Sequence, residues 1–477
     1  MLKTGVKGFV LKRVKICVKN DVRCRYRSTF GTALDAAAKM VMPKVMLENP
    51  IYLVANEIQS LTKGIISLVG SGHPVLSRLT NYYIESGGKR LRPMIVLLMS
   101  KALSEIPASE RDRIKVDYSD IPDDPVYSRN PSSIFFGAPV NNFNPLHILH
   151  GIKPLVNPLA GERDLLSEDF DRGNGILPKQ RRLAEIVEMI HAASLLHDDV
   201  LDHSTSRRGK PSGNSAFTNK MAVLAGDFLL SRANSAVTSI RNHEVSELVS
   251  ACISNLVEGE FMQLKNTALD PDLTTINNGT QEIPLEPKSA TALCHQYRVD
   301  IPQGLEVSHE VQVETAFNYY LHKSYLKTAA LISKSCRGAA ILAGSKEAVL
   351  DDCYSFGKNL GICFQLVDDM LDFTVSSAEL GKPAGADLEL GIATAPVLFA
   401  WKEYPALGTI IQRNFSQPGD IERVLEAVEK YDGVTKTKEL AREYRDKALK
   451  NLRNSLPESD SRSALEFLTN SVLTRRK

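Results

Sequence analysis

The chain has 477 residues, of which 43% are hydrophobic and 24% are charged. This composition is that of a folded protein and excludes a wholly disordered, collagen-like or polytopic membrane chain. Lys and Arg number 58 against 56 Asp and Glu, so the net charge of +2 does not indicate nucleic acid as a partner. The 7 cysteines include no C-x-x-C pair, which disfavours a disulfide scaffold and a zinc site and favours a reducing compartment.

The first residues differ sharply from this balanced average. Residues 1–30 carry nine basic residues against one acid, Asp21, with apolar residues interleaved among them. A basic, acid-poor and amphipathic N-terminus is typical of a mitochondrial presequence, and a basic disordered tail is the alternative. We therefore expect a presequence over approximately 1–30, and a protein of the mitochondrion, on the matrix side.

Proline is concentrated in two stretches of the chain. Residues 104–178 hold nine of the 23 prolines and residues 267–314 hold four. Long proline-rich segments resist helix and sheet and are usually loop insertions. We expect one domain over residues 45–477, interrupted at 104–178 and 267–314, although length alone suggests about three domains.

Most of the remaining chain has the periodicity of helices. Between Leu183 and Leu201, and again over 355–373, apolar residues recur at spacings of three and four. The same pattern covers three further segments, namely residues 311–342, 421–452 and 459–473, the last with Ser459 or Ser461 as a suitable N-cap. Because no convincing run of alternating β-branched residues is present, the sequence predicts an all-α fold, a single large helical bundle.

A repeated phrase stands inside two of these helical patterns. LLHDDVLD ends at Asp202 and QLVDDMLD ends at Asp372, so each contains DDxxD. In the first, Asp198 and Asp202 lie four residues apart, on one face of a helix and about 6 Å apart along its axis. The second repeats this spacing with Asp368 and Asp372. The middle aspartates, Asp199 and Asp369, lie about 100° further round, where they can accept supporting hydrogen bonds.

Two such carboxylate pairs on facing helices would line an opening with oxygen ligands. Mg²⁺ suits this arrangement, because it takes few carboxylates and keeps positions for phosphate oxygens and water. Solvated acidic faces are the alternative, but the apolar neighbours indicate mostly buried helices, where unpaired carboxylates are costly. Calcium storage is disfavoured because the glycine-containing loop of an EF-hand is missing.

Cationic clusters complement the aspartates. GGKRLRP, residues 87–93, places three cations after a glycine pair, and Arg207 and Arg208 follow the first aspartate segment. Glycine lets the backbone approach an anion closely, while Lys and Arg supply charge. The arginine pair could alternatively complement the dipole at a helix C-terminus. Together with the aspartates, these clusters predict two anions, one bridged through metal and one bound directly by cations.

GGKRLRP, the two DDxxD segments and the RRG that follows the first of them resemble the trans-isoprenyl diphosphate synthases. The resemblance runs from about Lys63 to the C-terminus, interrupted by the two predicted insertions, to which we assign no role. Phrases such as EIVEMIHAASLLHDDVLD, EGEFMQL and YLKTAALISKSCRGAA are similar to the mitochondrial long-chain polyprenyl (hexaprenyl to decaprenyl) diphosphate synthases of ubiquinone biosynthesis. This implies an isoprenoid synthase bundle with a central apolar cavity and a prenyltransferase that condenses isopentenyl diphosphate onto farnesyl or geranylgeranyl diphosphate.

The resemblance also implies a role for each motif residue. Two or three Mg²⁺ ions would be bound by Asp198, Asp202 and Asp368, and the full catalytic set would be Asp198, Asp199, Asp202, Asp368, Asp369 and Asp372. The isopentenyl diphosphate site would consist of Lys89, Arg92, His191 and Arg208. The allylic diphosphate would contact Arg207, Lys327, Thr328, Gln365 and Lys382. A core histidine remains the alternative for His191, and simple surface charge the alternative for Lys382.

Small residues below the first aspartates bear on product length. Ala192 and Ala193 lie roughly 7–9 Å from Asp198 along a helix axis, where small side chains would leave room for a growing chain. Close packing against a neighbouring helix is the alternative. The rival functions are a geranylgeranyl diphosphate synthase, a terpene cyclase and a non-catalytic subunit of a heteromeric synthase. We expect a homodimer or homo-oligomer, no nucleic-acid partner, and allow for peripheral contact with the mitochondrial inner membrane.

Overall fold

The computed structural model describes residues 50–69, 73–85, 90–110, 175–207, 210–264, 308–374 and 385–475. The predicted presequence and most of both predicted insertions lie outside these residues, so the division into a presequence and an interrupted domain stays a prediction.

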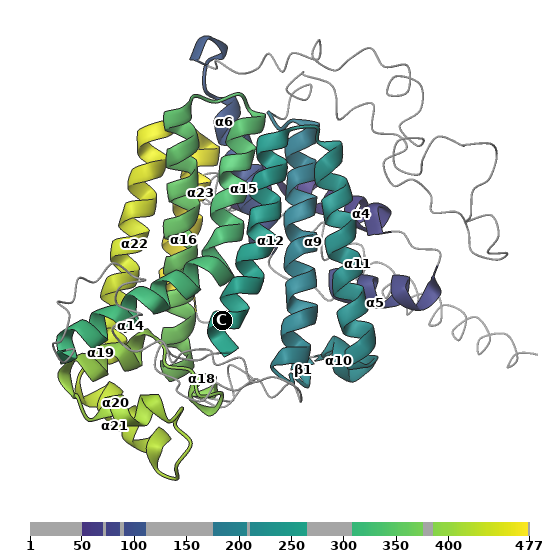
Figure 1. The fold of residues 1–477 in the computed structure, drawn as a ribbon. Coiled ribbons are helices and arrows are strands. Elements are labelled where there is room, and N and C mark those ends of the chain that lie inside the picture. The colour runs from purple at the N-terminus through teal and green to yellow at the C-terminus, as the bar shows by residue number, and fades with distance from the viewer. Residues whose placement is uncertain are drawn as a thin grey trace, which may run out of the picture.

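The described chain is helical apart from one short hairpin (Figure 1). Its N-terminal half contains α3 (Pro50–Leu53), α4 (Ala55–Val69), α5 (Pro74–Glu85), α6 (Leu91–Ser104), the 3₁₀ turn Ala108–Glu110, α9 (Pro178–Leu201), the strands β1 (Ser206–Arg207) and β2 (Lys210–Pro211), α10 (Gly213–Ala216), α11 (Asn219–Ser239) and α12 (His243–Leu264). Its C-terminal half contains α14 (His309–Ser324), the π-helical turn η6 (Tyr325–Ala329), α15 (Ala330–Leu342), α16 (Glu347–Thr374), α18 (Ala386–Glu389), α19 (Ala395–Glu403), α20 (Leu407–Gln412), α21 (Asp420–Lys430), α22 (Gly433–Ser455) and α23 (Asp460–Thr474). The all-α prediction is confirmed.

Local sequence explains where several of these helices begin. Pro178 starts α9, at a position whose missing N–H would have had no helical partner, and the Gln180 side chain accepts a hydrogen bond from the Leu177 N–H at 2.9 Å. Hydroxyl caps start three others, with Thr218 accepting from the N–H of Met221, Ser308 from Val311 and Ser459 from Arg462. Ser459 is therefore the N-cap of the last helix.

Two predicted helices are interrupted. The pattern over 311–342 predicts one continuous helix, but the π turn Tyr325–Ala329 separates α14 from α15. The prediction of one helix over 421–452 is likewise wrong, because Asp432 adopts a φ of 55° and separates α21 from α22. In addition, α14 begins at His309, within the range of the second predicted insertion.

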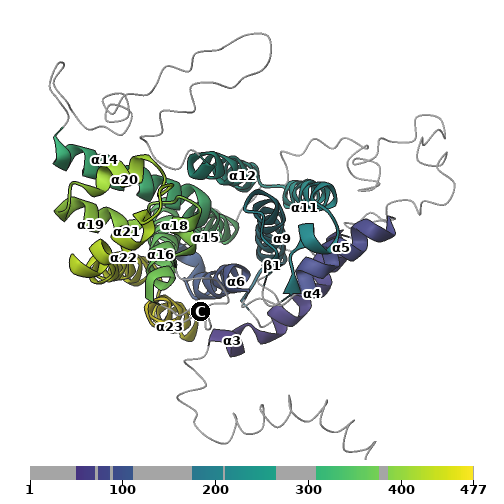
Figure 2. The same ribbon diagram turned by 90° about the horizontal axis from the view of Figure 1, so that it is seen from below.

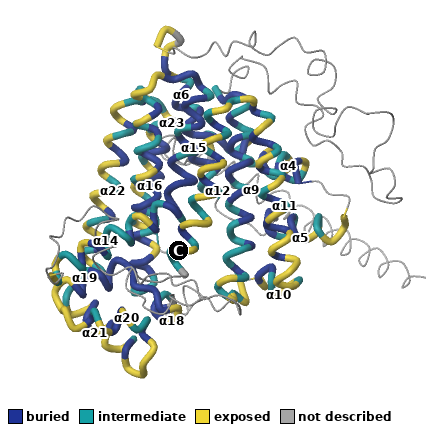
Figure 3. Tube along the Cα trace, viewed as in Figure 1, coloured by how far each residue is buried: buried dark blue, intermediate teal, exposed yellow. Residues whose placement is uncertain are grey.

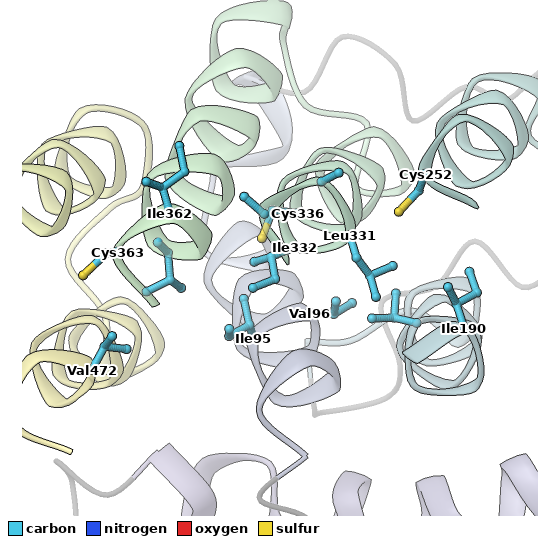
Figure 4. Packing of buried hydrophobic residues seen from close by; sticks show 14 of the residues in the cluster. Ile95, Val96, Ile190, Cys252, Leu331, Ile332, Cys336, Ile362, Cys363 and Val472 are labelled. Carbon is cyan, nitrogen blue, oxygen red and sulfur yellow. The ribbon is translucent and has the colours of Figure 1, made fainter. Parts of the chain in front are cut away.

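The long helices run along a common direction around two central ones (Figure 2). Helices α6 and α15 lie in the middle, with α9, α11 and α12 on one side and α16, α22 and α23 on the other. The inward faces are buried along the length of the bundle (Figure 3). Figure 4 shows the packing, with side chains from five helices converging: Ile95 and Val96, Ile190, Leu331 and Ile332, Ile362, and Val472.

Two glycines allow α16 to lie very close to its neighbour. A Cβ at Gly361 would overlap the backbone of Ala329 in the π turn, and one at Gly357 would overlap the backbone at Ser333 in α15. The absence of both side chains presses α16 against the segment that carries Lys327 and Thr328. The fold therefore fixes the π turn directly beside the second aspartate helix.

Nowhere in the described part of the chain is a helix both long and apolar enough to span a membrane.

Candidate active site

The two aspartate segments lie at the same end of the bundle. Helix α9 ends at Leu201, next to β1, and α16 ends at Thr374, close to α18 (Figure 1). Asp202 stands just beyond α9, but its N–H still donates to the Asp198 carbonyl at 2.8 Å, so the predicted four-residue relation is kept. Asp368 and Asp372 both lie within α16.

The middle aspartate of the first segment is fully buried and bonded. Asp199 accepts hydrogen bonds from the Tyr83 hydroxyl and from Arg207 Nε at 2.7 Å, and Arg207 Nη2 lies 2.5 Å from the same oxygen, Oδ1. Tyr83 in turn accepts the Gly213 N–H at 2.8 Å. Asp199 thus ties α9 to α5 and to the hairpin.

The second segment repeats this arrangement with different partners. Asp369 is buried and accepts the Tyr320 hydroxyl at 2.5 Å on Oδ2 and the Gln365 amide at 2.8 Å on Oδ1. Burial raises the pKa of Asp369, and the nearby carboxylate of Asp387 raises it further. The sequence prediction that Asp199 and Asp369 accept supporting hydrogen bonds is confirmed by these contacts.

The outer aspartates of the second segment are bound by the C-terminus and by the chain that follows. Arg475, after α23, donates from Nη2 to Asp368 Oδ1 at 2.7 Å and to the Phe364 carbonyl at 3.0 Å. Its guanidinium also lies 3.7 Å from the centroid of the Phe364 ring. Asp372 Oδ2 accepts the Asp387 N–H at 3.2 Å, and the Asp372 carbonyl accepts the Gly385 N–H at 3.0 Å.

Two residues of the π turn act on the two aspartate segments, Thr328 by hydrogen bonds to the second and Lys327 by its charge on the first. Lys327 Nζ lies 2.6 Å from Glu260 Oε2 and donates to Gln263 Oε1 at 2.9 Å, so α12 holds this ammonium in place. The Thr328 hydroxyl donates to Gln365 Oε1 at 2.7 Å, and Gln365 continues to Asp369. Helical π turns often occur at functional sites, and here the turn packs against α12 and α16 and carries two predicted allylic-site residues.

Asp198 stands in an electrostatically crowded position. Burial raises the pKa of Asp198 to about 7, and the carboxylates of Glu260 and Asp202 add to this shift, while Lys327 opposes it. Burial disfavours the negative charge of this carboxylate, and the cations Lys327 and Arg207 offset that effect only in part. A divalent cation supplies further positive charge, so the donor set fits the predicted metal.

No three His, Cys, Asp or Glu side chains of the described residues converge closely enough to enclose a metal ion. Oxygens of a bound diphosphate and water would therefore have to complete the ligand sets of these carboxylates. The residues that would hold Mg²⁺ are Asp198 and Asp202 on one side and Asp368 on the other.

The predicted isopentenyl diphosphate site is partly visible. Arg92 Nη1 lies 2.9 Å from His191 Nε2, so two of its four predicted residues are brought together from α6 and α9. Lys89 and Arg208 of this site, and Lys382 of the allylic site, lie outside the described residues. Their roles stay predictions.

The sequence patterns missed several residues of the site. Tyr83 and Tyr320 are separated from their aspartate partners by 116 and 49 residues, so no local pattern announces them. Glu260 and Gln263 stand in the phrase EGEFMQL, which is one of the phrases that resemble the family. That likeness could have identified them as residues of the site. His197, which stands beside Asp198, contacts α11 instead: its Nε2 lies 3.1 Å from the Val223 carbonyl, as expected of a structural residue.

An all-helical bundle with two aspartate motifs at one end defines the isoprenoid synthase class of fold. The profile of the polyprenyl synthetase family matches residues 164–283 and 288–428. The chain belongs to the polyprenyl synthetase family and is a prenyltransferase.

Named relatives agree with this membership. The mitochondrial hexaprenyl pyrophosphate synthase of Saccharomyces cerevisiae is 64% identical over 457 residues, which cover 95% of this chain and 96% of that protein. Decaprenyl-diphosphate synthase subunit 1 of Schizosaccharomyces pombe is 39% identical and covers 90% of this chain and 92% of its own. Among solved structures, a decaprenyl diphosphate synthase from Rhodobacter capsulatus matches with a TM-score of 0.60 at 25% identity, over 90% of this chain and 98% of that one.

Proposed function

We propose that this prenyltransferase condenses successive isopentenyl diphosphate units onto farnesyl or geranylgeranyl diphosphate. The product is a long-chain, all-trans polyprenyl diphosphate, the side-chain precursor of ubiquinone. The observation that carries the proposal is the hydrogen-bonded path from Thr328 through Gln365 to Asp369 of the second segment, next to Lys327, whose charge acts on Asp198 of the first. The names of the relatives support the long product and the mitochondrial location.

The chemistry follows from where the charges stand. Magnesium bound at Asp198, Asp202 and Asp368 would withdraw charge from the allylic diphosphate and so assist its departure. Lys327, fixed by Glu260 and Gln263, stabilises the negative charge that develops on the leaving oxygens. Because its position is set before the substrate arrives, little reorganisation is needed.

The other substrate is positioned by the neighbouring cations. Arg92 and His191 hold isopentenyl diphosphate so that its double bond attacks the allylic carbon as the C–O bond breaks. A carbon–carbon bond forms, and one proton is then lost to the departing diphosphate. The predicted apolar cavity beneath would exclude water, which would otherwise trap the cation.

Incorporation of labelled isopentenyl diphosphate tests this function. The purified protein is incubated with Mg²⁺ and farnesyl diphosphate, and the products are dephosphorylated and separated by chain length. We expect hexaprenyl or longer products that disappear when EDTA removes the metal. Incorporation that stops at the C20 product would instead establish a geranylgeranyl diphosphate synthase.

A heteromeric synthase is the second candidate, because one relative is named as subunit 1 of a decaprenyl-diphosphate synthase. Under this alternative the purified chain alone incorporates no label, and activity returns when a partner from mitochondrial extract is added. Activity of the isolated chain contradicts the alternative.

Product length is proposed to depend on Ala192 and Ala193, both buried in α9 below Asp198. Replacing Ala193 with Tyr should shorten the products, because the ring would fill the space into which the chain grows. Unchanged product length together with unchanged stability would remove Ala193 from the wall. The central apolar cavity itself stays a prediction.

A homodimer is proposed on the basis of an apolar outer surface. Helices α11 and α12 are antiparallel neighbours, and the beginning of α11 and the end of α12 expose Met221, Val223, Leu224, Val257 and Phe261. Clusters of exposed apolar residues of this kind mark contacts between proteins. Replacing Leu224 and Phe261 by Glu should convert a dimer to a monomer in sedimentation experiments; a wild-type monomer would contradict the proposal.

Delivery of so apolar a product also motivates the proposed peripheral contact with the inner membrane. Flotation of the protein with vesicles that contain cardiolipin tests it, and recovery in the soluble fraction alone would contradict it. Import into isolated mitochondria, with and without residues 1–30, tests the presequence.

A further inference from the structure

His197 stands immediately before Asp198 and contacts the neighbouring helix α11. Helices α9 and α11 lie side by side in the bundle (Figure 2). The Nε2 atom of His197 lies 3.1 Å from the Val223 carbonyl oxygen and 3.4 Å from Oδ1 of Asp227. Because a carbonyl oxygen only accepts hydrogen bonds, Nε2 carries the hydrogen and donates it to Val223. One imidazole N–H thus joins the first aspartate segment to α11.

Helix α11 leaves space for this ring at Gly226. A Cβ at this position would overlap the imidazole of His197, so any other residue at 226 would displace the ring from the helix. Val223, Gly226 and Asp227 lie within about one turn of α11. A carbonyl acceptor, a missing side chain and a carboxylate are therefore gathered around a single histidine, which fixes where that histidine can lie.

The residue on the other side of Asp198 is held in a different direction. Asp199 is bonded to α5 and to the hairpin. Successive residues of a helix are about 100° apart around its axis, so His197 and Asp199 project about 160° apart, from nearly opposite sides. Asp198 lies midway on the wider arc between them, and Asp202, about 40° from Asp198, lies on the same arc. Contacts on two nearly opposite sides hold the end of α9 against rotation about its axis, and such a rotation would redirect both carboxylates.

We propose that His197 is a positioning residue for the metal ligands of the first aspartate segment. Its hydrogen bond to α11 fixes the direction of Asp198 and Asp202, while Gly226 makes room for its ring. Groups that orient metal ligands in this indirect way commonly contribute about 10–100-fold to metal affinity. This inference rests on the proposed function, since it takes these aspartates as ligands of Mg²⁺. The alternative is a histidine that only stabilises the packing of α9 against α11.

Two variants of His197 and one control separate these roles. His197→Phe keeps an aromatic ring but removes the N–H, and His197→Gln keeps a side-chain N–H for the same carbonyl. The matched control is His309→Phe, because the Nε2 atom of His309 also lies 3.0 Å from a backbone carbonyl of another helix, that of Trp401 in α19. Folding of each variant is checked by the circular dichroism spectrum and the melting temperature.

Binding of Mn²⁺ in the presence of inorganic pyrophosphate, followed by electron paramagnetic resonance, reports on the metal ligands without turnover. We expect His197→Phe to weaken Mn²⁺ binding about tenfold and His197→Gln to restore most of the affinity. Gly226→Ala, which displaces the ring without changing α9, should weaken Mn²⁺ binding in the same direction. His309→Phe should lower the melting temperature but bind Mn²⁺ as tightly as the wild type.

A folded His197→Phe protein with the wild-type affinity for Mn²⁺ would overturn the proposal in favour of the packing role. If His197→Phe does not fold, Gly226→Ala decides in its place, and an unchanged Mn²⁺ affinity in that variant contradicts the positioning role. Failure of the proposed function looks different: the wild type would bind Mn²⁺ and pyrophosphate but incorporate no isopentenyl diphosphate, and the histidine comparison would still hold.

Discussion

The two aspartate segments have the same spacing, and each buries its middle aspartate beneath a tyrosine hydroxyl, but they differ in countercharge. Asp199 is paired with the guanidinium of Arg207, whereas Asp369 is bonded to the neutral amide of Gln365. The leading aspartates, Asp198 and Asp368, differ the other way round, because here it is the second segment whose aspartate is paired with an arginine. Asp198 is enclosed, and burial raises its pKa to about 7, while the side chain of Asp368 is 54% exposed and bound by Arg475.

This difference shows that a repeated motif does not give two equivalent sites. Asp198 has the greater electrostatic need for a metal ion, since burial disfavours its negative charge and Lys327 and Arg207 offset this only in part. Asp368 already has a cation beside it and faces solvent, so it would bind metal in competition with Arg475 of its own protein. The first segment should therefore be the stronger metal site.

The largest effect is expected on activity, when the leading aspartates Asp198 and Asp368 are replaced one at a time. We expect Asp198→Asn to lower kcat/KM about 10³-fold, the scale of losing a principal electrostatic contact at the reacting group. Asp368→Asn should cost about tenfold less, because Asp372 and solvent lie nearby. Incorporation of labelled isopentenyl diphosphate measures both, with Mn²⁺ binding followed by electron paramagnetic resonance. Equal losses in the two variants would remove the distinction.

The partners of the two middle aspartates, Arg207 and Gln365, can be compared by their contributions to the free energy of unfolding. Arg207→Met leaves Asp199 buried without its cation and should lower the free energy of unfolding by about 3–5 kcal/mol. Gln365→Met removes only a neutral donor from Asp369 and should cost about 1–3 kcal/mol. Urea denaturation without substrate gives both values. A larger loss for Gln365→Met would mean that the amide, not the guanidinium, is the more important partner.

The tyrosine hydroxyls that bond the two middle aspartates should contribute less to stability, and by similar amounts in the two segments. Tyr83→Phe and Tyr320→Phe each remove one hydrogen bond to a buried carboxylate, for about 1.5–3 kcal/mol of stability. We expect the Tyr83 variant to lose slightly more, because its hydroxyl also accepts the Gly213 N–H. Thermal unfolding measures the pair, and a Tyr83 variant as stable as the wild type would contradict the buried contact.

The smallest effect belongs to Arg475. Because its partner Asp368 is largely exposed, Arg475→Met should change the free energy of unfolding by less than about 1 kcal/mol. Removing this competing cation should nevertheless lower the Mg²⁺ concentration needed for half-maximal activity, by about two- to fivefold. A higher Mg²⁺ requirement would show that Arg475 assists metal binding and does not compete with it.

The sequence predicted the helices better than it predicted the site. Helix α16 followed from apolar periodicity, and the N-cap at Ser459 followed from its hydroxyl, since both signals are local. The π turn escaped because the apolar residues of 325–329 continue the helical pattern. The hydroxyls that fix Asp199 and Asp369 escaped for another reason, namely that their partners are distant in sequence and meet only when the helices pack.

The approach of Arg475 to Asp368 has a practical consequence for anyone who expresses this protein. Residues fused after Lys477 would begin three positions beyond Arg475, whose side chain contacts the second aspartate segment. Polyhistidine there would bring metal-chelating imidazoles to the place where divalent ions are expected, and would distort measurements of their affinity. A handle that a protease removes before the assay avoids this interference.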